Sequence, residues 1–477
     1  MFKNKGSNFC SKKVLFFLVS IFFLVQSLFA LELQIAPYLQ PGKDSTLDYE
    51  EKVILWQTSN EDGNFKVFYS SNEDEKEAKI TFKNLHFEPY PRLYRALLEN
   101  LDFDRVYQYK VFLDEKLIQQ GDFSTRTKDH HFKFVAFGCG AEGTIEQFDI
   151  AKEVLRQNPL FGVYLGDFGY PGRAASYLTN SFHFYNQIDK DKAGTDLMSR
   201  VPFYFTYGNH DVANGKGLTQ YEDEMASFYY FEPPCNGPVI KKEVLGVEEK
   251  VKDFIQAVGK TFDSKSIYSF DVGNTHFIAL DGNRWVNPKD ETLRGWIRND
   301  LAESNATWKI ILMHQPPFAG WINQLPKLIG DKEIAEDIIR ARSYVDLFQK
   351  GGIDLVLSAH VHAYERSSKI LYDSSSDTIS VSEKGIPYII SGAAGGHLHL
   401  DTIIHFASHY SYTSCIPSSF LRSSLPYLFK CSPYIEKGIY DDFSFSLIEI
   451  NGKKLKFSQM NRKGEEVDSL TLRKNNK

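Results

Sequence analysis

Residues 160–170 read LFGVYLGDFGY, and residues 353–364 read IDLVLSAHVHAY. In both stretches an apolar run of strand length ends at small residues, and side chains that can bind a metal follow directly. Three further stretches repeat this pattern: residues 132–138 lead to Cys139, residues 201–208 lead to Asn209-His210-Asp211, and residues 308–313 lead to His314. The carboxyl ends of neighbouring strands converge on one crevice of an open α/β sheet. We therefore expect these polar side chains to meet in one pocket.

Segments with helical periodicity alternate with the apolar runs. They cover residues 144–155, 293–301 and 334–348, and the last is followed by Gly351-Gly352 as a stop signal. Thr144 and Gln147 have the spacing of a capping box. This alternation predicts an α/β domain over residues 132–475.

Two further features belong to the same domain. Asn451-Gly452 lies between two apolar runs, which predicts a hairpin whose strands close the sheet of the domain. Residues 213–262 are polar and are interrupted by Pro233-Pro234, so we interpret them as an insertion.

The stretch 31–127 has a different pattern, with short alternating or β-branched runs separated by turn residues. Asp62-Gly63 between two of these runs is a hairpin signal. We expect an antiparallel sandwich of the immunoglobulin or fibronectin type III class. It contains no evident chemistry, so a structural or docking role is favoured over a catalytic one.

The first thirty residues have the organisation of a secretory signal peptide. Lys12 and Lys13 precede an apolar stretch at residues 14–25, and residues 27–30 read SLFA. We expect a secreted, periplasmic or otherwise extracytoplasmic protein with no stable membrane span after removal of the signal. The alternative is an uncleaved anchor, which the shortness of the apolar run disfavours.

Charge and cysteine content narrow the partners and the crosslinks. The formal charge is −6, and loss of the four lysines in residues 1–30 takes it to −10. An acidic chain binds polyanions poorly, which disfavours nucleic acid as a bound partner, as opposed to a small phosphorylated substrate. Export permits disulfides, and Cys415 with Cys431 is the first choice for a bridge.

The order of the motifs carries a resemblance. Gly166-Asp167-Phe168-Gly169-Tyr170, then Gly208-Asn209-His210-Asp211, then His314, then HVHAYER at residues 360–366 resembles the signature of purple acid phosphatases within the metallophosphoesterase (calcineurin-like) superfamily. The resemblance implies an αββα sandwich, in which two β-sheets are flanked by helices, behind the smaller β-sandwich. It also implies an acid phosphatase-like hydrolase with two metal ions, iron plus a divalent ion such as Zn, Mn or Fe.

The resemblance further assigns roles to side chains. Asp167 would bridge both ions, because a carboxylate offers two oxygens. The other ligands would be Tyr170 and His362 for the first ion, and Asn209, His314 and His360 for the second. His210 would act on the phosphoryl oxygens or the leaving group without binding metal, with Asp211 orienting its ring.

The implied reaction is hydrolysis of phosphoric monoesters by a metal-bound hydroxide. One alternative is phosphodiester hydrolysis by the same site. Another is a catalytically degenerate phosphate-binding or cell-surface interaction protein.

That last alternative is motivated by Cys139, which stands where the family has an Asp ligand of the first ion. The thiolate could ligate and favour softer ions, Glu142 could reach in instead, or the site could hold one ion weakly. Cys139 could also be a small apolar residue with no ligand role.

Three other features are weaker. His397 and His399 could line the pocket or face solvent, and Glu365 with Arg366 could form an ion pair that holds the loop. Asn305-Ala306-Thr307 fits a glycosylation sequon.

Overall fold

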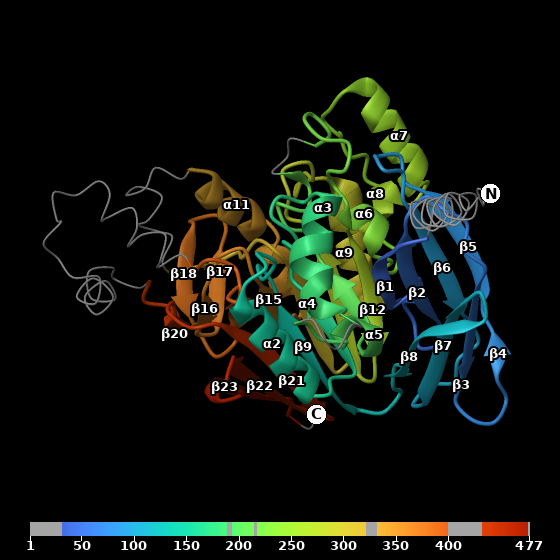
Figure 1. The fold of residues 1–477 in the computed structure, drawn as a ribbon. Coiled ribbons are helices and arrows are strands. Elements are labelled where there is room, and N and C mark those ends of the chain that lie inside the picture. The colour runs from blue at the N-terminus through green and yellow to red at the C-terminus, as the bar shows by residue number, and fades with distance from the viewer. Residues whose placement is uncertain (1–30, 188–192, 214–216, 321–331, 399–431, 476–477) are drawn as a thin grey trace, which may run out of the picture.

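The computed structural model describes residues 31–187, 193–213, 217–320, 332–398 and 432–475 (Figure 1). The amino-terminal signal, the Cys415–Cys431 pair and His399 lie outside these ranges. Within them, no helix is both long and apolar enough to cross a lipid bilayer.

The amino-terminal part consists of eight strands in two four-stranded antiparallel sheets, coloured from blue to turquoise in Figure 1. One sheet contains β1 (Leu33–Gln40), β2 (Lys52–Thr58), β6 (Arg92–Leu98) and β5 (Lys79–Asn84) in that order. The other contains β4 (Lys76–Glu77), β3 (Phe65–Ser70), β7 (Val106–Leu113) and β8 (Lys116–Ser124). Buried side chains from both sheets, among them Trp56 and Tyr109, form one core between them. Assignment to the immunoglobulin or fibronectin type III class stays a prediction.

The prediction of a hairpin at Asp62-Gly63 is wrong. Strand β2 pairs with β1 and β6, whereas β3 pairs with β4 and β7, so the turn carries the chain from one sheet to the other. A β-carbon on Gly63 would lie 2.5 Å from the ring of Phe65, which is too close for a side chain. The glycine is therefore needed for the close packing of this connection. The local turn signal was real, but strand pairing depends on distant partners.

The larger part contains two mixed sheets. The six-stranded sheet has the order β11 (Phe203–Phe205), β10 (Phe161–Tyr164), β9 (His131–Phe137), β21 (Ser444–Asn451), β22 (Lys454–Asn461) and β23 (Glu466–Arg473). The seven-stranded sheet has the order β12 (Tyr268–Val272), β13 (Thr275–Leu280), β14 (Trp308–Met313), β15 (Leu355–Ser358), β19 (Tyr388–Ser391), β16 (Tyr364–Ser367) and β20 (Ile435–Ile439). Strands β17 (Ile370–Asp373) and β18 (Thr378–Val381) form a separate ribbon.

The two sheets pack face to face through a shared apolar core. Phe134 of one sheet meets Phe277 of the other edge to face, with ring centroids 5.3 Å apart, inside a fully buried cluster. Each outer face has its own apolar cluster, one including side chains of α2 (Ile145–Arg156) and the other side chains of α9 (Glu291–Glu303) and α12 (Val345–Gly351). The result is the sandwich of two sheets flanked by helices that was expected for residues 132–475.

The helices match the periodic segments with one exception. Thr144 caps α2 by accepting the backbone N–H of Gln147 at 3.2 Å, while the side chain of Gln147 accepts from the N–H of Gly143 instead of closing a reciprocal box. The single stripe expected over residues 334–348 is two helices, α11 (Lys332–Arg342) and α12, because the chain turns at Ser343-Tyr344. Gly352 then ends α12 in a left-handed conformation.

The remaining helices are short apart from α7, at the top of Figure 1. They are α3 (Ala174–Ser176), the π-helical turn η1 (Tyr177–Phe182), α4 (His183–Tyr185), α5 (Leu197–Arg200), α6 (Ser227–Tyr230), α7 (Glu248–Val258) and α8 (Phe262–Lys265).

The segment interpreted as an insertion packs against the sandwich. Tyr38 of β1 donates a hydrogen bond to the carbonyl of Tyr230 at 2.7 Å, and Tyr230 donates to Gln57 of β2 at 2.8 Å. Arg95 of β6 pairs with Glu232 at 2.8 Å. The sandwich is thereby joined to the chain that follows strand β11.

Candidate metal centre

Each predicted site residue follows the end of a strand, and the two sheets bring these ends together. Strands β9, β10 and β11 are parallel and lead to Cys139, Asp167 and Asn209, respectively. Strands β14 and β15 are parallel in the other sheet and lead to His314 and His360. Because the sheets face each other, ligands from both meet at a single edge.

The backbone at three of these positions is left-handed. Cys139, Asp167 and His360 have φ values of 56°, 60° and 67°. Side chains with a β-carbon rarely adopt this region, and such residues persist only where the surroundings hold them. Here each turn re-aims a side chain away from its strand and into the pocket.

Asn209, His314 and His360, the residues expected to hold the second ion, lie together and are called the second cluster below. His314 Nε2 lies 3.1 Å from Asn209 Oδ1 and 3.2 Å from His360 Nδ1, and His360 Nδ1 lies 3.1 Å from Asn209 Oδ1. Three metal-capable atoms thus form a nearly equilateral triangle. These residues would hold one metal ion through two imidazole nitrogens and one amide oxygen.

Hydrogen bonds to the outer nitrogens orient two of the histidines. His314 Nδ1 donates to the carbonyl of Leu165 at 2.6 Å, and His362 Nδ1 donates to the carbonyl of His397 at 2.7 Å. In the neutral ring the other nitrogen, Nε2, then presents a lone pair. In His314 this Nε2 faces Asn209 and His360, and in His362 it faces Tyr170 at 3.2 Å.

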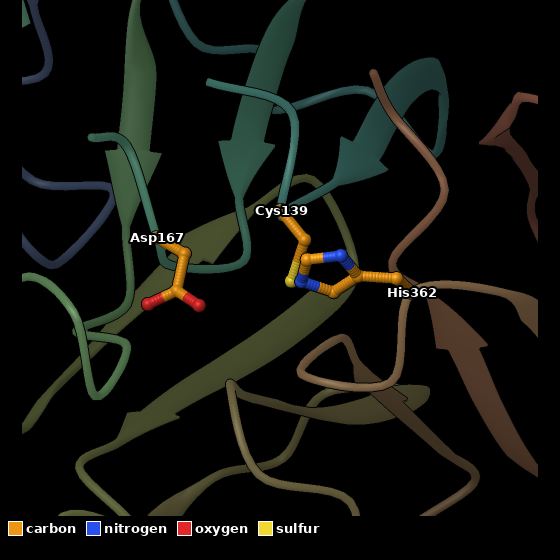
Figure 2. Close-up of side chains that lie close together, drawn as sticks. All are labelled: Cys139, Asp167 and His362. Atoms are coloured by element: carbon orange, nitrogen blue, oxygen red, sulfur yellow. The ribbon is translucent and has the colours of Figure 1, made fainter. Parts of the chain in front are cut away.

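The first cluster contains Cys139, Asp167, Tyr170 and His362. The ligand atoms of Cys139, Asp167 and His362 all lie within 4.8 Å of one another, and Figure 2 shows their side chains pointing toward a common centre. The hydroxyl of Tyr170 lies 3.4 Å from Asp167 Oδ2. Cys139 and Asp167 are buried, whereas Tyr170 and His362 reach the surface in part.

Asp167 belongs to both clusters. Its Oδ2 lies 3.3 Å from His314 Nε2 and 3.4 Å from the Tyr170 hydroxyl, and its Oδ1 accepts the backbone N–H of His210 at 3.0 Å. Burial alone would raise the pKa of Asp167, but His314 and His210 outweigh it and hold the pKa well below its usual range. The carboxylate is therefore ionised between the two groups of ligands.

The surroundings also keep His360 neutral. Burial, and then the neighbouring ring of His314, lower the pKa of His360 well below its ordinary value. A neutral imidazole is the form that binds a metal. Burial and the charge of Asp167 raise the pKa of the Cys139 thiol.

Asp211 does not orient His210 as expected. Its Oδ2 accepts hydrogen bonds from the backbone N–H groups of Asp167 at 2.7 Å and Gly208 at 2.8 Å. Its Oδ1 accepts the backbone N–H of Phe168 at 3.0 Å and the hydroxyl of Tyr177 at 2.5 Å. These donors take up both oxygens of a fully buried carboxylate. Burial and the charge of Asp167 raise the pKa of Asp211 to about 7.

His210 itself lies beside the first cluster. Its ring packs against Tyr170 in an edge-on arrangement with centroids 4.6 Å apart, and its side chain is half-buried. The ring is therefore next to a residue of the first cluster and is partly accessible to solvent.

Other predicted residues have different partners. Glu142 pairs with His397, an exposed side chain, and is not among the groups that surround Asp167. The ion pair expected between Glu365 and Arg366 is wrong: Arg366 pairs with Asp468 at 2.6 Å, while Glu365 accepts the N–H of Gly320 at 2.7 Å. Alternate strand residues point to opposite faces, which separates these neighbours.

Sequence reasoning missed Asp337 on α11. The buried carboxylate of Asp337 lies 3.8 Å from His360 Nε2 and 3.4 Å from Arg284 Nε. His360 Nε2 is itself buried and has no hydrogen-bond partner among the described residues. The helix of Asp337 comes from a segment without a motif, so no pattern in the chain linked it to the site.

The donor set fits metal ions. Asn209 Oδ1 offers lone pairs, and His314 Nε2 does so because its Nδ1 donates to Leu165. His360 Nδ1 does so in the neutral tautomer that carries its proton on Nε2. Lone pairs at 3.1–3.2 Å repel one another unless a cation or a shared proton lies between them. Imidazole and oxygen ligands suit Zn, Fe and Mn.

Comparison with known proteins gives the same family as the motifs. A family model described as calcineurin-like phosphoesterase matches residues 129–364. The chain is 22% identical over 369 residues to phosphoenolpyruvate phosphatase of Allium cepa, covering 73% of this chain and 68% of that protein. It is 22% identical over 337 residues to Fe(3+)-Zn(2+) purple acid phosphatase 12 of Arabidopsis thaliana, covering 67% and 62%. The solved structure of purple acid phosphatase PPD1 from yellow lupin (Lupinus luteus) superposes with a TM-score of 0.61 at 16% identity, covering 92% of this chain and 74% of that one.

Proposed function

The chain is a purple acid phosphatase-like calcineurin-like phosphoesterase, and we propose that it uses a dinuclear metal site to hydrolyse phosphoric monoesters outside the cytoplasm. The family makes it a phosphatase. The metal number, the class of ester and the location are the parts that are proposed.

The position of Asp167 carries the proposal. One buried carboxylate lies 3.3 Å from His314 of the second cluster and 3.4 Å from Tyr170 of the first. Both distances are to Oδ2, so this carboxylate lies between the two sets of ligands and can serve an ion on either side. The two sets of ligands around Asp167 therefore support two adjacent ions.

Ions bound there would lower the pKa of a water molecule and offset the charge of the phosphoryl oxygens. The residues of the chain hold that arrangement. The carbonyl of Leu165 keeps the His314 ring in the orientation that presents Nε2, and the carbonyl of His397 does the same for His362. Iron with a divalent ion is the pair indicated by the Fe(3+)-Zn(2+) purple acid phosphatase 12 of Arabidopsis thaliana. Which ion this chain takes at the first cluster depends on Cys139.

His210 is proposed to act on the substrate. Its backbone N–H is bonded to Asp167, which holds the residue at the site, while its ring is half-buried against Tyr170. An imidazole in that place can donate to a phosphoryl oxygen or to the leaving oxygen. Asp211 supports the backbone of the site and does not take part in that transfer.

The proposed location rests on the charged and apolar pattern of residues 1–30. The amino-terminal strands are proposed to form a fibronectin type III-like module that supports the catalytic part. Its contacts with the segment after β11, such as Tyr38 with Tyr230, support a structural role.

The test is hydrolysis by the full chain after supply of iron, zinc or manganese. We expect turnover of p-nitrophenyl phosphate, about two metal ions per chain by elemental analysis, and slower turnover of bis(p-nitrophenyl) phosphate. Asp167→Ala should lose metal and activity together, whereas His131→Ala, a change at an exposed histidine, should lose neither.

Faster turnover of the diester would assign the site to phosphodiesters. Flat activity with every metal, together with retained binding of inorganic phosphate, would instead identify a degenerate phosphate-binding protein. Full activity in Asp167→Ala would contradict the site.

A further inference from the structure

A sulfur atom belongs to the first cluster. Cys139 is fully buried and carries a free thiol, and its sulfur lies within 4.8 Å of the ligand atoms of Asp167 and His362. The purple acid phosphatase signature has a carboxylate at this position. The replacement changes the donor chemistry of the site without removing a donor.

Hydrogen bonds hold both the backbone and the sulfur of Cys139. The N–H of Cys139 donates to the carbonyl of Gly166 at 3.1 Å, and the carbonyl of Cys139 accepts from Gly396 at 2.9 Å. The sulfur accepts the backbone N–H of His360 at 3.2 Å. Hydrogen bonds of this kind to sulfur are part of the environment that tunes thiolate ligands in metal sites.

A purely structural cysteine would have apolar neighbours around its sulfur. Part of the environment of Cys139 is apolar, since it packs in the same cluster as Leu165 and Ala359. The side that faces the pocket is polar, with the Asp167 carboxylate, His362 and the N–H of His360. The sulfur therefore lies at the boundary between core and metal pocket, where a ligand atom is needed.

We propose that Cys139 is a thiolate ligand of the first ion, beside Asp167, Tyr170 and His362, and that this ion is a borderline-soft divalent metal such as Zn²⁺. This deepens the proposed function and rests on its dinuclear site. A thiolate has the same formal charge as the carboxylate it replaces but favours softer ions, so hard ions such as Fe³⁺, Mn²⁺ or Mg²⁺ lose preference. Binding releases the thiol proton to solvent as the sulfur–metal bond forms.

The direct test is X-ray absorption at the zinc edge of the full chain loaded with zinc. We expect a zinc–sulfur distance of about 2.3 Å, with about half a sulfur per zinc when two zinc ions are bound. Cys139→Asp and Cys139→Ser should remove that signal. Cys235→Ser, a change at the other free cysteine of the described chain, should leave it unchanged.

Zinc bound without a sulfur neighbour would overturn the proposal, and so would a sulfur signal that persists in both Cys139 variants. Failure of the wild-type chain to take up zinc would overturn it as well. The readout does not depend on hydrolysis: a sulfur signal in a chain that hydrolyses no ester would refute the proposed function and leave the ligand assignment standing.

Metal selectivity gives a second measurement. In competition between Zn²⁺ and Mn²⁺, Cys139→Asp should lower the preference for zinc by about tenfold or more. Residues that only hydrogen-bond to a ligand already change metal affinity by about 10–100-fold, and Cys139 is proposed to be a ligand itself. An unchanged ratio in a folded Cys139→Asp protein would show that the thiol does not select the metal and would overturn that part of the proposal.

Discussion

Asp211 Oδ2 accepts the backbone N–H of Asp167 at 2.7 Å, so one buried carboxylate holds the backbone of another. Asp167 has a left-handed φ of 60°, and this hydrogen bond is one of those that fix it there. Asp167 and Asp211 both follow strand ends in the sequence, but this hydrogen bond gives them different roles. Asp167 faces the metal pocket, and Asp211 supports it from behind.

Asp211→Asn should destabilise the protein and weaken metal binding. The amide that replaces one carboxylate oxygen is a donor, and it would face backbone N–H groups that need an acceptor. We expect a loss of about 1–3 kcal/mol in the free energy of unfolding, measured by urea denaturation, with lower metal content. Asp74→Asn, at an exposed position, is the control. Unchanged stability would show that these hydrogen bonds do not hold the loop.

His210→Ala should keep both metals and slow turnover by about 10²–10⁴-fold, the usual contribution of a general acid or base. The side chain lies beside Tyr170 and is not part of either ligand set. Elemental analysis and kcat on the monoester measure the two effects separately. Loss of metal in this variant would place His210 among the ligands instead.

Asp337→Asn should weaken metal binding without touching a ligand. Its carboxylate is the charged group near His360 Nε2, at 3.8 Å, and favours a proton on that nitrogen while Nδ1 faces the metal. Partners of this kind are worth about 10–100-fold in metal affinity. Glu336→Gln, at the adjacent exposed position on the same helix, is the matched control. Equal metal affinity in both variants would remove Asp337 from the site.

His276 predicts a dependence of stability on pH. Burial alone would lower its pKa, but the carboxylates of Asp271 at 2.7 Å and Asp300 at 2.8 Å raise the pKa to about 9. Because the folded pKa is above the unfolded one, of about 6.5, the stabilisation is complete below pH ~6.5 and is lost as the pH rises through ~9. Its size is at most about 3 kcal/mol.

Urea denaturation between pH 6 and 10 measures this contribution. His276→Gln should be less stable than the wild type at the acid end and should converge with it at the alkaline end. A constant difference between the two proteins across that range would show that the ring does not change its charge there.

Glu50→Gln should destabilise the junction between the sandwich and the catalytic part. Glu50 is buried, accepts from Arg126 Nε at 2.6 Å and also pairs with Lys52, and Arg126 in turn donates to the carbonyl of Asp271 at 3.2 Å. Loss of the charge leaves two buried cations, at a cost of about 3–5 kcal/mol. Glu75→Gln, which breaks the exposed pair with Lys110, should cost less than about 1 kcal/mol. Similar thermal shifts in the two variants would contradict this difference.

Much of the fold could be predicted from local patterns. Helix α2 begins at the cap read from Thr144, and the hairpin of β21 and β22 surrounds Asn451-Gly452, because caps and tight turns depend on neighbouring residues. The Asp62-Gly63 turn and the break between α11 and α12 were not predictable in this way. Both depend on which distant surfaces the flanking segments bury.

The sequence by itself determined the family and the set of residues placed at strand ends, since Asp167, His314 and His360 follow apolar runs whose length and order are local properties. Only the tertiary structure decided which partners the individual side chains contact. It turned Asp211 toward the backbone, brought Asp337 beside His360 and set the Cys139 sulfur against the N–H of His360. These contacts join positions that are 44, 23 and 221 residues apart, respectively, and such pairings form only when the distant segments pack together.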